Sequence, residues 1–434
     1  MNGLPWWGWA LLGPGALATV AVFTALFIPD LKKPPLSCDC EEPAGSEGFL
    51  AAVSRYLNVP ILRGGTAEIL QNGCRFFPAM LDAIRGARET VNFQVYIFES
   101  DPVGQRFVDA FEERARAGVE VRVLLDGFGS WRFKQRDRER LRRAGVKLEF
   151  FRPLRLLTLV RAFKRDHRRA IVVDGRVAFT GGAAVAKKWD GDARHPEEWR
   201  DSMARLTGAL AHGVQTAFGE NWVYRTGEIL TGERFFPPSE GNAPDTASSP
   251  GDPCGLALVS SPADMAQPIR QLIWLSFTCA KQRLWISSSY FVPEGRLREA
   301  IAERAREGVD VRLLVPGPAT DAKPVRLAGR SHYEELLEAG VRIFEFEPAM
   351  MHAKTVVVDG RWTMVGSANM DNRSVELNEE NILGVSDPRL AAQVEHGLRG
   401  DFARAREIRL EEFRRRGRAA RVLERLARLL VEQY

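Results

Sequence analysis

Two periods of apolar residues alternate along the chain. Over residues 91–98 and 119–125, apolar side chains recur at every second position, which is typical of a β-strand. Between these runs, over residues 103–117, apolar side chains are three and four positions apart, which predicts a helix. Strands that alternate with helices favour an α/β fold with a largely parallel sheet.

The same order of elements recurs in the second part of the chain. The run Arg-Ala-Gly-Val-Glu-Val-Arg at 116–122 is echoed by Arg-Glu-Gly-Val-Asp-Val-Arg at 306–312. The run Ala-Gly-Val-Lys at 144–147 is echoed by Ala-Gly-Val-Arg at 339–342. The nearly constant spacing between copies indicates an internal duplication, so we expect two halves over residues 57–236 and 254–402, each a mixed, largely parallel sheet flanked by helices. The stretch 237–253, rich in Pro, Gly and Ser, is typical of a flexible linker.

The N-terminal stretch 4–29 contains only apolar or small residues. About 20 such residues span a bilayer, so we expect one transmembrane helix and then a linker over 30–56. A cleaved signal peptide is the alternative, but no Lys or Arg precedes the apolar run. A lipoprotein signal ending at Cys38 is another, and charged residues before that cysteine count against it. Lys32 and Lys33 follow the apolar run, so the positive-inside rule predicts a single-pass protein of the cell membrane whose body is cytoplasmic.

Composition narrows the class of partner. The hydrophobic fraction of 45% and charged fraction of 27% are ordinary for a globular protein, while the net charge of +5 favours an anionic partner, either acidic lipid or nucleic acid. Residues 403–434 are rich in arginine with leucines at helical spacing, which predicts a basic helix that lies on a membrane or packs on its own domain. The five cysteines form neither a disulfide framework nor a zinc-ligand spacing, and Cys38-x-Cys40 is interpreted as incidental.

Candidate chemistry gathers around a short apolar strand at 355–358. Period-two alternation puts His352 and Lys354 on one face of the strand leading into it, and Asp359 begins a turn after it. The return strand is followed by backbone N–H groups, a hydroxyl and an amide, from Gly366, Ser367 and Asn369. A proton carrier or nucleophile, a cation and several neutral donors around one volume suit a tetrahedral phosphoryl group.

A second copy of this arrangement lies earlier in the chain. His167 and Arg169 precede a strand at 170–173, Asp174 begins the turn, and Gly181-Gly182 follows the return strand. This copy departs from the other at two places. Arginine stands at 169 where the other copy has lysine, which keeps a cation of different shape. Ala184 stands where the other copy has Asn369, and losing a donor at such a place costs on the order of a hundredfold in rate.

The pattern His-x-Lys-x-x-x-x-Asp, present twice with one arginine for lysine and with Gly-Ser-x-Asn after the second, resembles the phospholipase D superfamily. The runs Tyr-Ile-Phe at 96–98, Ser-Tyr-Phe-Val-Pro at 289–293 and His-Ala-Lys-Thr at 352–355 most resemble bacterial cardiolipin synthases. The resemblance implies transfer of a phosphatidyl group in two steps through a phosphohistidine, with no metal or cofactor. It implies His167 as nucleophile and His352 as general acid and then base.

The resemblance also implies an orienting carboxylate downstream of each histidine, and Asp201 and Glu380 stand at the matching places. Which carboxylate serves which histidine stays open. The set expected at the site comprises catalytic His167, Arg169, Asp174, His352, Lys354 and Asp359, with Asp201, Glu380, Asn369, Ser367, Gly182 and Gly366 in support. For Asp174 and Asp359 a structural role at the turn is the alternative.

The expected activity is a phosphatidyltransferase that joins two phospholipids, with phosphatidylglycerol as the expected substrate, into cardiolipin at a membrane. A phospholipase D that uses water as acceptor is the alternative, followed by a nuclease and by a non-catalytic lipid-binding scaffold. No nucleic-acid partner is expected, because the N-terminal apolar segment counts against it and no aromatic stacking platform is visible. The sequence leaves the oligomeric state open.

Overall fold

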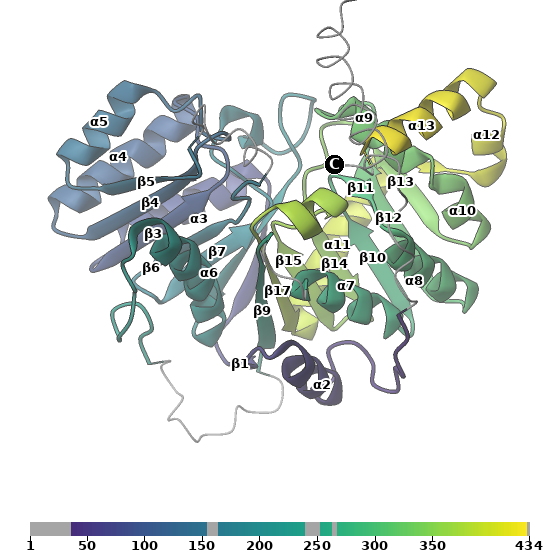
Figure 1. Cartoon of the computed structure of the whole chain (residues 1–434), viewed down its shortest axis with the longest axis horizontal. Helices are drawn as coiled ribbons and strands as arrows, with labels where there is room; N and C mark the ends of the chain where they lie inside the picture. The colour runs from purple at the N-terminus through teal and green to yellow at the C-terminus, as the bar shows by residue number, and fades with distance from the viewer. Residues whose placement is uncertain (1–35, 154–163, 239–251, 263–266, 432–434) are drawn as a thin grey trace, which may run out of the picture.

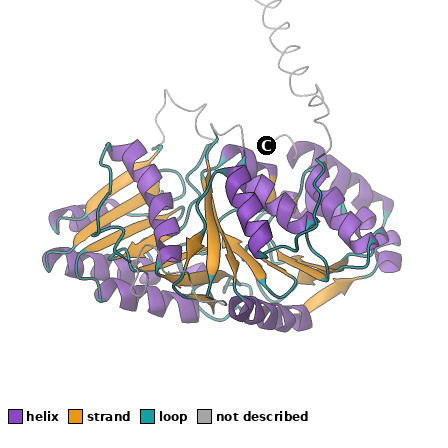
Figure 2. Cartoon of the chain, turned by 90° about the horizontal axis from the view of Figure 1, so that it is seen from below, coloured by secondary structure: helices purple, strands orange, loops and turns teal. Residues whose placement is uncertain are grey.

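A computed structural model of the chain describes residues 36–153, 164–238, 252–262 and 267–431. Two sheets lie side by side (Figure 1), and helices cover both of their faces (Figure 2). The first half forms a seven-stranded sheet in the order β2 (Ala67–Gln71), β8 (Ser202–Thr207), β7 (Val177–Gly181), β6 (Ala170–Val173), β3 (Thr90–Val95), β4 (Glu120–Asp126) and β5 (Lys147–Phe151).

The second half repeats this order and adds a strand at each edge. Its nine-stranded sheet runs β1 (Leu62–Arg63), β9 (Cys254–Ser260), β17 (Glu380–Ser386), β15 (Trp362–Gly366), β14 (Thr355–Val358), β10 (Arg283–Ser287), β12 (Asp310–Pro316), β13 (Arg342–Phe346) and β18 (Ala405–Ile408). A separate two-stranded sheet pairs β11 (Phe291–Val292) with β16 (Met370–Asp371). The common strand order confirms the duplication.

The sheets are mixed, as expected, but the expectation that they are largely parallel is wrong. Within the two large sheets, parallel pairing is confined to β3–β4–β5 and to β10–β12–β13, and the other neighbours pair antiparallel. The strands that follow the histidines return through tight Asp-Gly turns, and strands joined by so short a turn must be antiparallel. Parallel strands need a crossover, and α4 (Pro102–Arg116) and α8 (Gly295–Arg306) supply the first crossover in each half.

The remaining helices lie around the sheets. In the first half they are α3 (Gly73–Arg85), α5 (Gln135–Arg143) and α6 (Ala209–Thr226), and in the second α7 (Pro268–Thr278), α9 (Lys323–Arg330), α10 (Tyr333–Glu338) and α11 (Pro388–Arg404). Each half packs a helix against the sheet of the other half. Helix α6 contacts β9 of the second sheet, and α11 contacts β2 of the first sheet. Apolar residues from both sheets share one core, including Leu206 and Leu383.

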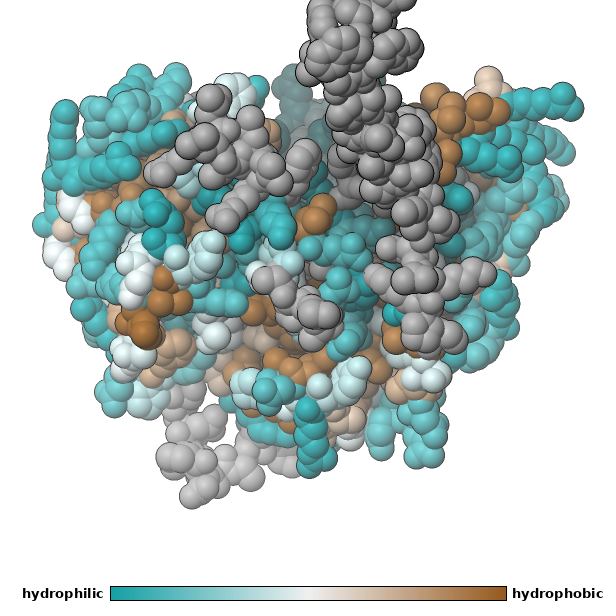
Figure 3. All heavy atoms as spheres, in the orientation of Figure 1, coloured by the Kyte–Doolittle hydropathy of each residue, from teal (hydrophilic) through white to brown (hydrophobic). Residues whose placement is uncertain are grey.

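Two terminal segments differ from the sequence expectation. The stretch 30–56 is not linker throughout, because residues 47–57 form α2 (Glu47–Leu57), whose Phe49, Leu50 and Val53 pack into the core of the second half. The C-terminal stretch is not one helix, since it contains β18, α12 (Leu410–Arg414) and α13 (Arg418–Val431). Apolar side chains of α13 reach the surface beside its arginines (Figure 3).

The expected transmembrane segment at 4–29 lies outside the described residues, as does most of the expected linker at 237–253. Among the described residues, no helix is both long and apolar enough to cross a membrane.

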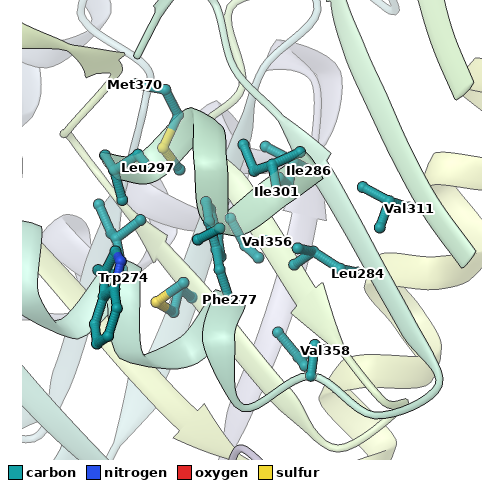
Figure 4. Packing of buried hydrophobic residues seen from close by; sticks show 14 of the residues in the cluster. Trp274, Phe277, Leu284, Ile286, Leu297, Ile301, Val311, Val356, Val358 and Met370 are labelled. Atoms are coloured by element: carbon teal, nitrogen blue, oxygen red, sulfur yellow. The ribbon is translucent and has the colours of Figure 1, made fainter. Parts of the chain in front are cut away.

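The core of the second half is formed where α7 and α8 cover β10, β12 and β14, with Phe277, Ile286 and Val356 packed together (Figure 4).

Candidate active site

The two histidine segments each cross to the other half of the molecule. The backbone N–H of His167, ahead of β6, donates to the carbonyl of Glu379 at 2.9 Å. In the same way the backbone N–H of His352, ahead of β14, donates to the carbonyl of Arg200 at 2.7 Å. His167 therefore lies beside Glu379, the residue before the expected carboxylate Glu380. His352 lies beside Arg200, the residue before the expected carboxylate Asp201.

Those carboxylates orient the imidazoles. Nδ1 of His167 lies 2.9 and 3.0 Å from the two carboxylate oxygens of Glu380. Nδ1 of His352 lies 2.6 Å from Oδ2 of Asp201. The pairing left open by the sequence is thus crossed, and neither half holds a complete histidine–carboxylate pair. With Nδ1 engaged in this way, Nε2 is the ring nitrogen that each histidine has available for chemistry.

Both rings line one cavity of about 570 Å³ between the halves. Cationic, aromatic and carboxylate side chains share its wall, among them Tyr96, Arg165, Arg169, Lys188, Trp189, Trp199, Tyr290, Asp321, Asp371 and Arg373. The expectation that the two histidines face a common volume is confirmed. A cavity with this many cations suits an anionic ligand.

Burial and the neighbouring cations govern the protonation of the histidines. Burial, with Arg169 and Lys354 next in importance, lowers the pKa of His167 well below its usual value. Burial and Lys354 lower the pKa of His352 in the same direction. Near pH 7, both imidazoles of the free enzyme are therefore neutral, which is the form a nucleophile needs.

The two carboxylates differ in acidity. Burial raises the pKa of Glu380 to about 8 and that of Asp201 to about 6. Asp201 also accepts hydrogen bonds from the indole of Trp189 at 2.8 Å and the backbone N–H of Ser202 at 2.8 Å, which favour its charged form. Near pH 7, Asp201 is therefore mostly ionised, whereas Glu380 holds its proton more readily.

The cations of both motifs are held by backbone carbonyls. Nζ of Lys354 donates to the carbonyl of His352 at 2.6 Å and lies 3.2 Å from Nε2 of the same ring. The guanidinium of Arg169 donates to the carbonyls of His167 and Ala183. Burial lowers the pKa of Lys354 to about 7, and Lys354 lies behind the cavity wall, outside the set of residues that line it.

Ser367 and Gly182 contact the carboxylates that bind the histidines, namely Glu380 and Asp201. The hydroxyl of Ser367 donates to Glu380. A side chain on Gly182 would place a Cβ 2.3 Å from a carboxylate oxygen of Asp201, and one on Gly366 would place it 2.3 Å from the carbonyl of Asn381. Ser367, Gly182 and Gly366 are not among the residues that line the cavity, so the expectation that they surround the phosphate directly is corrected, and close packing explains both glycines. Asn369 does line the cavity, where it contacts the hydroxyls of Ser289 and Ser374.

The expected catalytic role of Asp174 and Asp359 is corrected by their position. Each lies at the far end of its short strand, with φ of 52°, and neither lines the cavity. Asp174 accepts backbone N–H bonds from Arg88, Glu89 and Thr90 at 2.8–2.9 Å. Asp359 accepts the equivalent bonds from 281–283 at 2.7–2.9 Å. Both aspartates tie the turn to the start of the central strand.

Sequence reasoning gave no role to several residues of the cavity. Nζ of Lys188 lies 4.0 Å above the ring of Trp199 and 4.7 Å above that of Trp189, and both rings contact His352. Tyr96 contacts the ring of His167 from the other side of the cavity. Tyr96 and Tyr290 lie in the runs that carry the family resemblance, while Lys188 and Arg373 have no such signal.

Metal ligands do not gather at this cavity. Within the described ranges, one group of three residues could hold a metal ion, and it consists of Cys38, Cys40 and Cys279, none of which lines the cavity. The expected reaction without a metal remains a prediction.

Known proteins resemble this chain in sequence and fold. The family described as cardiolipin synthase, PLD-like domain, matches residues 80–188 and 276–401. A cardiolipin synthase of Geobacillus thermodenitrificans is 35% identical over 377 residues, covering 86% of this chain and 73% of that protein. Cardiolipin synthase A of Pseudomonas fluorescens SBW25 is 35% identical over 382 residues, covering 88% and 78%.

Among solved structures, the phosphatidylserine synthase of Haemophilus influenzae superposes with a TM-score of 0.67 at 17% identity, over 88% of this chain and 99% of that one. This likeness shows the fold. The family match over most of both repeats, together with these two relatives that align across most of their own length, settles the membership. The chain belongs to the cardiolipin synthase family, whose members carry the phospholipase D-like domain.

Proposed function

We propose that the protein transfers a phosphatidyl group from one phosphatidylglycerol to another, forming cardiolipin and releasing glycerol. The observation that carries this proposal is the pair of imidazoles on one cavity, each bound at Nδ1 by a carboxylate of the opposite half. Two such groups suffice for a double displacement at phosphorus, because one attacks while the other moves the proton.

In the proposed first step, Nε2 of His167 attacks the phosphorus of the donor lipid, and the bond from phosphorus to the glycerol headgroup breaks. His352, as imidazolium, gives its proton to the leaving oxygen. In the second step, the neutral His352 takes the proton from a hydroxyl of the acceptor lipid. That oxygen attacks the phosphohistidine, and the bond from phosphorus to His167 breaks. The products are cardiolipin and glycerol, and the enzyme returns to its starting state.

The acidity of the two carboxylates supports this assignment of roles. Asp201, with the lower pKa, is the better partner for an imidazolium at His352. Glu380, with the higher pKa, fits a neutral imidazole at His167. An anionic phosphodiester in the cavity would offset the repulsion from Lys354 and Arg169 and so raise the pKa of His352 toward the protonated form.

The rim of the cavity supports a membrane as the source of both lipids. On the first half, Phe128 lines the cavity and is exposed, and Trp131 beside it is 67% exposed. On the second half, Val292 lines the cavity and belongs to a small apolar cluster with Ala328 of α9 and Ala427 of α13. The outer side of α13 exposes apolar side chains among arginines, namely Val422, Leu423, Leu426 and Leu429 with Arg418, Arg421, Arg425 and Arg428. An apolar face with basic flanks suits the headgroup region of an anionic bilayer.

We propose further that the segment 4–29 is the single membrane anchor and that the catalytic body is cytoplasmic. The two lysines after the apolar run support this orientation. An anchor and an interfacial helix together would hold the cavity mouth at the bilayer surface.

Product analysis tests the proposed reaction. Full-length protein in vesicles of phosphatidylglycerol should release glycerol and form a four-chain lipid, and His167→Ala and His352→Ala should each abolish both. His195→Ala, at an exposed histidine paired with Glu198 and outside the cavity, is the matched control. Phosphatidic acid in place of the four-chain lipid would identify a hydrolase. Cleavage of an oligonucleotide without lipid turnover would identify a nuclease.

A further inference from the structure

Three of the five cysteines meet at one place in the fold, outside the active-site cavity. The sulfur atoms of Cys38, Cys40 and Cys279 all lie within 4.8 Å of one another. Cys279 ends α7, and 239 residues separate it in sequence from Cys40. The sequence shows no partner for Cys38-x-Cys40, which favours an incidental pair, but the fold brings Cys279 beside both cysteines.

Contacts that do not involve sulfur hold this segment in place. The backbone N–H of Ala44 donates to the carbonyl of Cys279 at 3.3 Å, and Nζ of Lys281 donates to the carbonyl of Cys40. Ala44 is buried, and the following helix α2 packs Phe49 edge-on against Trp362. The approach of the three thiols is therefore set by the packing of α2 and its leading loop on the second half.

The surroundings of the thiols are suited to a cation. Cys279 is buried, Cys40 is partly buried and Cys38 is exposed, so the group is closed on the protein side and open to solvent on the other. The thiols border a cavity of about 560 Å³ that is also lined by three carboxylates, from Asp39, Glu41 and Glu42. A carboxylate from this set or a water could complete a four-ligand shell.

We propose that Cys38, Cys40 and Cys279 bind a thiophilic metal ion, with Zn²⁺ as the ion of first choice, in a structural site that fastens the segment before α2 to α7. Thiolate ligands select soft or borderline ions over Mg²⁺ and Ca²⁺. Two thiolates on one zinc ion lie about 3.8 Å apart, given a zinc–sulfur bond of about 2.3 Å. The sulfurs of Cys40 and Cys279 lie 2.7 Å apart, so Cys40, in a loop, moves outward by about 1 Å when the ion binds.

A disulfide between Cys40 and Cys279 is the competing use of the same contact. It would need only two sulfurs and would leave Cys38 with no role, whereas a metal ion uses all three. Binding of a metal ion displaces the thiol protons, because the thiolate is the form that acts as ligand. Metal affinity should therefore rise steeply with pH.

The experiment is a titration of the full-length protein in detergent, stripped of metal and kept under a phosphine reductant. Added Co²⁺ should give the sulfur-to-cobalt charge-transfer band with one ion per chain, and Zn²⁺ should displace it. Cys38→Ser, Cys40→Ser and Cys279→Ser should each weaken Co²⁺ binding by more than about tenfold. Cys74→Ser and Cys254→Ser, at cysteines outside the cluster, should leave it unchanged.

Three results would overturn the proposal. The first is wild-type protein without a thiolate–cobalt band, and the second is a band that survives Cys279→Ser. The third is a Cys40–Cys279 disulfide in protein prepared without oxygen, detected by non-reducing peptide mapping. Because the readout is spectroscopic, it does not depend on the proposed lipid chemistry, and glycerol release by each variant reports separately on whether the catalytic body is folded.

Discussion

Replacing Glu380 with glutamine tests the crossed pairing of the two halves. Glu380 binds Nδ1 of His167 with both carboxylate oxygens, at 2.9 and 3.0 Å, and accepts from the hydroxyl of Ser367. When ionised, the carboxylate of Glu380 accepts the proton on Nδ1, which leaves the lone pair on Nε2. The amide of glutamine can turn its NH₂ group toward Nδ1, which favours the tautomer with the proton on Nε2 and blocks attack on phosphorus.

The loss of kcat/KM expected for Glu380→Gln is large compared with the loss that follows removal of one hydrogen bond. Loss of a single neutral bond costs about 1 kcal/mol, or about fivefold, while a wrong tautomer in a histidine–carboxylate pair costs on the order of 10⁴-fold in other enzymes. We therefore expect Glu380→Gln to lower kcat/KM for glycerol release by about 10³- to 10⁴-fold, or about 4–5.5 kcal/mol. Glu379→Gln is the matched control, because Glu379 is the buried neighbour but pairs with Arg152 and Arg168 instead of a histidine. It should cost less than about tenfold.

A substrate with a better leaving group distinguishes the role of Asp201 from that of Glu380. A phosphodiester that releases p-nitrophenol needs no proton on its leaving group, so it bypasses the general acid. Asp201→Asn should then retain release of p-nitrophenol and accumulate a covalent phosphoenzyme, whereas Glu380→Gln should stay inactive at this step. The reverse pattern, with Asp201→Asn inactive and Glu380→Gln rescued, would show that our assignment of pairing and roles is wrong.

Three other expectations follow from the geometry. The value of kcat/KM should fall below about pH 6, because protonation removes the charge of Asp201, and above about pH 7, because Lys354 loses its proton in the free enzyme. Asp201→Asn should remove the fall on the acid side, and a variant that keeps this fall would contradict the assignment. Ala184→Asn should lower the free energy of unfolding by about 1–3 kcal/mol in a urea titration and should not raise the rate, because Ala184 lies in an apolar core where an amide meets few partners. Asp359→Ala should lower the free energy of unfolding by about 3 kcal/mol or more, because three backbone N–H groups lose their acceptor. The kcat of the folded variant should stay within a few-fold of that of the wild type. Loss of kcat without loss of stability would restore a catalytic role for Asp359.

Membrane engagement is tested by comparing two forms of the substrate. Leu423→Ser with Leu426→Ser should slow glycerol release from phosphatidylglycerol vesicles severalfold and leave the rate on water-soluble short-chain phosphatidylglycerol unchanged, since only the former requires α13 to enter a bilayer. Ile229→Ser, at an exposed residue outside α13, is the control. Equal loss on both substrates would indicate damage to the fold instead.

Local patterns in the sequence predicted much of the fold correctly. The β-branched run at 355–358 forms β14, and the alternating run at 91–98 overlaps β3 over residues 91–95. Periodicity could not predict the direction of pairing, because a buried strand has the same pattern in a parallel or an antiparallel sheet. The prediction of a linker up to residue 56 failed for a related reason, since the helix α2 is stabilised by contacts with the second half that the local composition does not show.

The sequence by itself identified the side chains that we expect to carry the chemistry, because His167, His352, Arg169 and Lys354 lie in short motifs whose spacing is local. Only the tertiary structure decided which carboxylate each histidine binds, since Glu380 is 213 residues from His167 and Asp201 is 151 residues from His352. Those distances along the chain are closed by the packing of one sheet against the other, which no local period records. The same packing brings Lys188, Trp189 and Trp199 of the first half to His352 of the second.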